Sequence, residues 1–137
     1  MATRVVHCKR SPYDVYVGRG PDPRTGVSGK WGNPFRIADG LSRMEALRRH
    51  AEWILDQPGL LASLHEIKDK VLGCWCRPAA CHGDTLARLA DMSGLVDGKS
   101  VLPGQGTSPT WKADVLARLF DPLADVGKDE PSIFGKE

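Results

Sequence analysis

The chain has 137 residues, of which 41% are hydrophobic and 26% charged, a composition typical of one globular domain and not of a disordered or fibrous chain. The net charge of +2 argues against strong nonspecific binding to DNA. No apolar run approaches the ~20 residues that cross a membrane, and the first residues contain no signal-peptide core. We therefore expect a cytoplasmic protein with no membrane partner, whose four cysteines stay reduced and serve metal binding or chemistry.

The N-terminal third predicts two strands followed by a long loop. Residues 4–8 and 13–17 are rich in β-branched and aromatic residues, which is typical of short strands joined by a tight connection. The loop from Gly18 to Gly40 contains six glycines and three prolines, and loops of this length are usually functional, or here a lid packed over the core. Up to Arg36 there are seven basic and two acidic residues, which suits phosphate or nucleic acid and equally a solvated basic surface.

The rest of the chain predicts helices around one central strand. Ser42 and Glu45 have the spacing of a capping box at a helix start, and Pro58 both ends that helix and opens the next. The Val-Leu run before Cys74 suits a strand that is buried on both faces. The predicted elements are helices over 42–57, from Pro58 onward, over 83–92 and over 111–120, and a strand over 70–76.

This order of elements favours a right-handed βαβ arrangement. We predict an α/β protein, a small Rossmann-like three-layer domain with a short, mostly parallel sheet, over residues 1–93. A linker follows over 94–110, and an appended C-terminal helix and loosely ordered tail over 111–137. The helix either docks on the core or binds a partner, and the sequence does not decide the oligomeric state.

A cluster of sulfur and imidazole ligands lies where the central strand ends and the next helix begins. It consists of Cys74, Cys76, Cys81 and His82. Cys74 and Cys76 leave one face of a strand, where either could also be a small buried hydrophobe, and Trp75 points into packing on the other face. Two interpretations stay open, and in the first the four side chains hold a structural zinc ion, although their spacing is not that of a zinc finger. In the second, a helix N-terminus lowers the pKa of Cys81, His82 acts as acid or base, and Asp84 orients it or only complements the helix dipole.

Five motifs occur in an order that is similar to a known family. They are Tyr13-Asp14-Val15-Tyr16-Val17-Gly18-Arg19, Trp31-Gly32-Asn33-Pro34-Phe35, Ser42-Arg43, Leu72-Gly73-Cys74-Trp75-Cys76-Arg77-Pro78 and Cys81-His82-Gly83-Asp84. Over roughly residues 4–92 the chain resembles the domain of unknown function 4326, a small bacterial and bacteriophage family. The resemblance implies that Arg19, Trp31, Asn33, Arg43, Cys74, Cys76, Cys81, His82 and Asp84 are motif positions, and it implies no reaction.

Two functions from different classes follow. The first is the binding of a nucleotide, nucleoside or nucleic-acid base, with Gly18, Arg19, Trp31, Asn33, Arg43 and Gly83 as ligand-binding residues. By analogy with other small α/β folds, an enzyme of this kind would cleave or transfer at an N-glycosidic bond, with His82, Asp84 and Cys81 as catalytic residues. The second is a non-catalytic, zinc-stabilised module that binds nucleic acid or protein; no cofactor other than zinc is expected.

Overall fold

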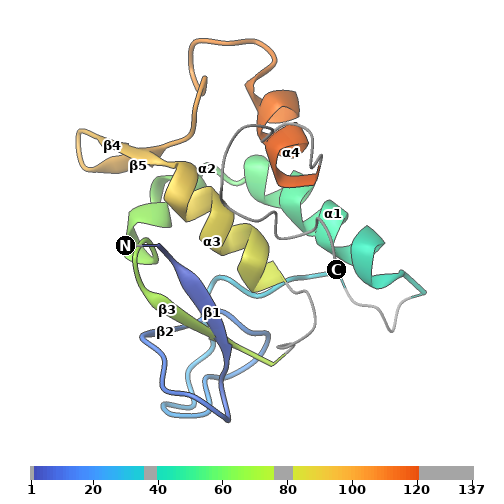
Figure 1. The fold of residues 1–137 in the computed structure, drawn as a ribbon, viewed down its shortest axis with the longest axis vertical. Coiled ribbons are helices and arrows are strands. Elements are labelled where there is room, and N and C mark those ends of the chain that lie inside the picture. Colours follow the sequence, from blue (N-terminus) through green and yellow to red (C-terminus); the bar gives the residue numbers. More distant parts are fainter. Residues whose placement is uncertain (1, 36–39, 76–81, 121–137) are drawn as a thin grey trace.

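The computed structural model describes residues 2–35, 40–75 and 82–120, and its centre is a three-stranded parallel sheet (Figure 1). Strand β3 (Val71–Cys74) lies in the middle, with β1 (Arg4–His7) on one side and β2 (Val15–Tyr16) on the other. The register pairs residues 4–7 with 71–74 and residues 15–16 with 72–73. The two predicted N-terminal strands therefore exist, but each pairs with β3 and not with the other.

The connection between β1 and β2 crosses over β3. Parallel strands usually need a dozen or more residues between them, whereas here residues 8–14 suffice. They pass close to the sheet because Gly73 has no side chain: a Cβ at this position would lie 2.6 Å from the Tyr13 ring. The glycine of β3 thus makes room for the short crossover.

The helices begin and end largely where the sequence predicts. Ser42 caps helix α1, because its hydroxyl accepts a hydrogen bond from the Glu45 amide at 3.1 Å. Pro58 occupies the first position of α2. The helical elements are α1 (Arg43–Leu55), α2 (Pro58–Ala62), the 3-10 turn η2 (Leu64–Glu66), α3 (His82–Met92) and α4 (Trp111–Phe120).

The two faces of the sheet are covered differently. Leu72 and Cys74 face the main core, which α1, α3 and α4 complete, and these helices gather on one side of the sheet (Figure 1). Val71 packs on the opposite face against a small cluster of Cys8, Tyr13 and Tyr16. The predicted α/β class, parallel sheet and C-terminal helix are confirmed. In the described part of the chain, the face of the sheet opposite to the main core is covered by the cluster of Cys8, Tyr13 and Tyr16.

Residues 94–101, predicted to belong to a linker, form a β-hairpin. Strands β4 (Gly94–Val96) and β5 (Lys99–Val101) pair antiparallel around Asp97 and Gly98, whose φ angles of 51° and 79° are left-handed. An Asp-Gly pair is a strong signal for such a two-residue turn. The hairpin is tied to η2, since the Ser100 hydroxyl accepts a hydrogen bond from the His65 amide at 2.7 Å.

Helix α4 docks on the protein's own core, which was one of the two outcomes expected for it. Val115 and Leu119 are each 1% exposed and belong to the main core cluster. The tail after Phe120 lies outside the described residues. Within 2–35, 40–75 and 82–120 no helix has the length and apolar character needed to cross a membrane.

Candidate ligand site

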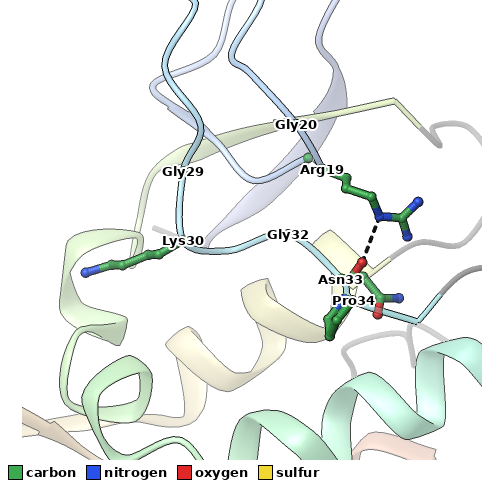
Figure 2. Close-up of a pocket in the computed structure, with 8 residues that line it drawn as sticks. Arg19, Gly20, Gly29, Lys30, Gly32, Asn33 and Pro34 are labelled. Atoms are coloured by element: carbon green, nitrogen blue, oxygen red, sulfur yellow. Dashed lines mark hydrogen bonds between the residues drawn. The ribbon is translucent and has the colours of Figure 1, made fainter.

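A cavity of about 420 Å³ opens beside the glycine-rich loop that follows β2 (Figure 2). Its described walls are Gly18, Arg19, Gly20, Gly29, Lys30, Gly32, Asn33 and Pro34, and we call it the Arg19 pocket. Half of these residues are glycines, so the backbone itself forms much of the wall and a ligand can approach it closely. The pocket begins directly after β2, at the carboxyl end of the sheet, where open α/β sheets usually bind ligands.

Arg19 is exposed, but its guanidinium is held in place. Nε donates to the Asn33 carbonyl at 2.8 Å, drawn in Figure 2, and Nη2 donates to the Phe35 carbonyl at 3.3 Å. A guanidinium has five N–H donors, so three remain without a partner in the part of the chain that the structure describes. Arg19 is therefore a positioned cation with donors to spare.

The positive charge of Lys30, the second cation of the pocket, is already paired with an acidic side chain. Its ammonium forms an ion pair with Glu66 at 2.9 Å, and Figure 2 shows its side chain pointing away from Arg19. Arg19 therefore supplies the positive charge that a ligand in this pocket would meet.

Asn33 shapes the loop through its side chain. Its Oδ1 accepts a hydrogen bond from the Phe35 amide at 2.8 Å, and the residue is buried. The expected role of this side chain in reading a base edge stays a prediction, since its oxygen already has a backbone donor.

Several backbone amides of the pocket wall have no acceptor within residues 2–35, 40–75 and 82–120. Among the described residues, the N–H groups of Gly18, Arg19, Gly20, Gly32 and Asn33 donate to no other residue. Unpaired amides beside a cation are the donors that bind phosphate oxygens in other glycine-rich loops. The wall thus offers donors of the kind that anion sites use.

The strand–helix junction contacts the chain at Val17, directly before the glycine loop. His82, the first residue of α3, is buried, and its Nε2 hydrogen-bonds to the Val17 carbonyl. A carbonyl only accepts, so Nε2 carries the proton. The Val17 amide in turn donates to the Gly73 carbonyl at 2.9 Å, which ties β3, α3 and the start of the loop together.

The other predicted site residues lie in different surroundings. Gly83 and Asp84 are buried in the first turn of α3, Cys74 is buried in the main core, and Arg43 is exposed at the start of α1. None of them is among the described walls of the Arg19 pocket. Their catalytic and binding roles stay predictions.

The predicted zinc site is only partly visible. Cys76 and Cys81, two of its four ligands, lie outside the described residues. Within the ranges that are described, no three His, Cys, Asp or Glu side chains are grouped to hold a metal ion. The zinc prediction therefore stays a prediction.

The structure gives Trp31 and Trp75 opposite environments. Trp31 is 4% exposed and packs in the main core, so a base can stack on it only if the ring leaves the core. The prediction that Trp75 is packed away is wrong, because 48% of this residue is exposed. It does leave the face of the sheet opposite to Cys74, and its indole Nε1 donates to the Tyr16 hydroxyl at 2.7 Å.

The sequence interpretation missed His50 on α1. Its ring is fully buried, 5.2 Å from the His82 ring in an edge-to-face arrangement, and neither nitrogen has a hydrogen-bond partner among the described residues. Burial, followed by the nearby charge of His82, lowers the pKa of His50 to about 3. The sequence could have indicated that His50 is buried, because position 50 falls on the apolar face of α1 with Leu47 and Ile54.

The sequence interpretation also missed a hydrogen-bond network around Asp22, near the start of the glycine-rich loop. Asp22 is buried and accepts hydrogen bonds from the Tyr13 hydroxyl at 2.6 Å and from the Arg24 amide at 2.9 Å. Burial alone would raise the pKa of Asp22, but these bonds and the Arg24 guanidinium outweigh it and hold the pKa below its usual value. The same guanidinium lies 4.0 Å above the Tyr13 ring.

These features define a small parallel α/β protein with a cationic, glycine-walled pocket at the carboxyl end of its sheet. Residues 3–92 match the family described as domain of unknown function (DUF4326), and the chain belongs to this family, as its motifs predict. No curated protein and no solved structure is detectably similar to the chain.

Proposed function

We propose that the protein binds a nucleotide or another phosphorylated nucleoside, with the phosphate in the Arg19 pocket. One observation carries the proposal: the guanidinium of Arg19 is fixed by two backbone carbonyls at the wall of a cavity of about 420 Å³. Small-molecule sites are typically about 300–1,000 Å³ in volume.

The chemistry of the wall supports phosphate over other ligands. Arginine forms strong, charge-assisted hydrogen bonds to phosphate oxygens, and the amides of Gly18, Gly20 and Gly32 add neutral donors. The analogy with Rossmann-like folds, which bind phosphates where a parallel strand passes into a glycine-rich turn, supports the same location. A helix on the second face of the sheet is not needed for such a site.

An enzymatic role at an N-glycosidic bond belongs to the same proposal. His82 supports it, because this imidazole is bonded to Val17, the residue directly before the pocket wall. In that mechanism His82 or Asp84 would move the proton at the leaving base, with Cys81 as a further candidate. The choice of reaction rests on fold analogy.

Isothermal titration of the full-length protein with AMP, adenosine, ribose 5-phosphate and inorganic phosphate tests the binding proposal. We expect AMP and ribose 5-phosphate to bind and adenosine to bind far more weakly. Arg19→Ala should weaken AMP binding by about 10- to 100-fold, the usual effect of losing hydrogen bonds to a charged group, and Arg19→Lys should lie between.

Lys99→Ala is the matched control, because it removes one positive charge at an exposed residue of β5, outside the described walls of the pocket. Its affinity for AMP should equal that of the wild type. The proposal is wrong if no phosphorylated compound binds, or if Arg19→Ala and Lys99→Ala bind AMP equally well. Metal analysis of the same samples tests the zinc prediction.

A further inference from the structure

Trp75 is a large aromatic side chain left half in solvent at the end of the central strand. It follows β3 directly, and 48% of it is exposed, whereas the other described tryptophans are buried or partly buried. A single exposed apolar side chain is common on protein surfaces, so a ligand is indicated only by how this ring is held and by what lies beside it.

The exposed ring is nevertheless fixed. Its Nε1 donates to the Tyr16 hydroxyl at 2.7 Å, and the His7 ring meets it edge to face, with the ring centroids 5.8 Å apart. A ring whose orientation is already set loses little conformational freedom when a ligand stacks on it.

The same hydroxyl links Trp75 to the Arg19 pocket. Tyr16 Oη donates to the Arg19 carbonyl at 2.9 Å while it accepts from Trp75. The hydroxyl reaches this position because Gly18 has no side chain, since a Cβ there would lie 2.5 Å from Tyr16 Oη. The Trp75 indole and the Arg19 backbone thus hydrogen-bond to the same oxygen atom, although Trp75 is not among the described walls of the Arg19 pocket.

We propose that Trp75 is the stacking platform for the base of a ligand whose phosphate is bound by Arg19. This inference rests on the proposed function and makes it more specific, because it requires an aromatic base and a phosphate joined by one sugar. A free nucleotide has this chemistry, and so does one nucleotide unit of a single-stranded nucleic acid. Every base offers a flat π face, so stacking on Trp75 selects for a base without selecting its sequence.

The test compares Trp75→Ala and Trp75→Phe with Trp111→Phe in the full-length chain. Trp111→Phe is the matched control, because it removes another partly exposed indole, from α4. The probes are AMP, ribose 5-phosphate and a ten-nucleotide oligo(dA), titrated by calorimetry at one salt concentration. Trp75→Ala should weaken AMP binding by about tenfold or more, Trp75→Phe less, and neither should change ribose 5-phosphate affinity by more than about twofold.

Fluorescence gives a second readout that does not depend on the size of the affinity loss. Stacking of a base quenches an indole, so AMP should quench the wild type and Trp111→Phe, and the quench should be absent in Trp75→Phe. Circular dichroism checks that each variant is folded.

The outcomes separate this inference from the proposed function. If Trp75→Ala binds AMP as tightly as the wild type while Arg19→Ala does not, the stacking role of Trp75 is wrong and the phosphate pocket stands. If none of the three probes binds the wild type, the proposed function fails and the stacking role fails with it. If oligo(dA) binds more tightly per site than AMP, and this binding depends on Trp75, the ligand is single-stranded nucleic acid. If oligo(dA) binds as tightly as AMP or more weakly, the ligand is the free nucleotide.

Discussion

The His50 imidazole is fully buried beside His82 without a hydrogen-bond partner among the described residues, and burial lowers its pKa to about 3. In the unfolded chain a histidine takes up a proton near pH 6.5. The contribution of His50 to stability is therefore fully present above pH 6.5 and falls as the pH drops from there towards 3, by about 1.4 kcal/mol for each pH unit.

Replacing this imidazole tests its effect on stability. His50→Leu removes two unpaired buried nitrogens, so its free energy of unfolding at pH 7 should equal or exceed that of the wild type. Between pH 7 and pH 5 the wild type should lose about 2 kcal/mol that the variant retains. Urea unfolding at both pH values measures the difference, and equal pH slopes for the two proteins would show that His50 is not kept neutral by the fold.

Burial also shifts the pKa values of Tyr13 and Tyr16, so these residues make the stability of the fold depend on pH in the alkaline range. Burial, followed by the hydrogen bond to Asp22, raises the pKa of Tyr13 to about 12, and burial also raises the pKa of Tyr16. An unfolded tyrosine ionises near pH 10, so the stability that these groups contribute is present below pH 10 and is lost as the pH rises through about 12 for Tyr13.

The chain contains no other tyrosine, so absorbance at the tyrosinate band reports on this pair alone. We expect less ionisation at pH 10 in the folded protein than in concentrated urea, where the midpoint lies near 10. A midpoint near 10 in the folded protein would contradict the buried hydrogen bond between Tyr13 and Asp22.

At the level of elements, the short crossover between β1 and β2 depends on the glycine of β3. Gly73→Ala would place a Cβ 2.6 Å from the Tyr13 ring, and overpacking of this kind costs about 1–3 kcal/mol. We expect chemical denaturation to show a loss in this range, together with a lower pKa for Tyr13 as its ring is displaced towards solvent.

Gly59→Ala is the matched control for the same methyl group. This position lies in α2 with nothing within 4 Å of an added Cβ, so alanine should stabilise the helix by about 0.5–1 kcal/mol. If both variants had the same stability as the wild type, the crossover would not be packed against β3 as closely as the structure places it.

The elements differ in how far the sequence alone determines them. Helix α1 was predicted well because its signals are local: Ser42 caps one end and Pro58 stops the other. The strand order could not be predicted, since strands of two to four residues carry too little pattern to fix their partners. The hairpin at Asp97 and Gly98 was overlooked because the glycines and prolines that follow it made the whole segment resemble a linker.

The candidate site, too, could be predicted from the sequence only in part. The Val17 carbonyl, directly before the glycine loop, hydrogen-bonds to His82 at the strand–helix junction. No described residue of that junction lines the Arg19 pocket, so a site shared by the two segments stays a prediction. Alternation along β3 correctly placed Trp75 opposite to Cys74, but alternation does not say how completely each face is covered. Only the tertiary packing decides that Trp31 is enclosed and Trp75 is exposed.

At the scale of the whole molecule, the core extends beyond the family match. The match ends at residue 92, yet Leu102, Val115 and Leu119 belong to the same hydrophobic cluster as Leu72 and Leu86. Helix α4 also packs its edge on α1, where the Arg48 guanidinium lies 5.4 Å from the centre of the Phe120 ring. The C-terminal helix should therefore unfold together with the sheet, and not as a separate unit.

Leu119→Ala tests this single core. Leu119 is 1% exposed, so truncation should cost about 2–5 kcal/mol and should shift one cooperative transition seen alike by circular dichroism and tryptophan fluorescence. Leu95→Ala, at a residue that is 62% exposed in the hairpin, makes the same chemical change and should cost less than about 0.5 kcal/mol. If Leu119→Ala instead gave an early transition of small amplitude and left the main one unchanged, α4 would be an independent element attached to the family domain.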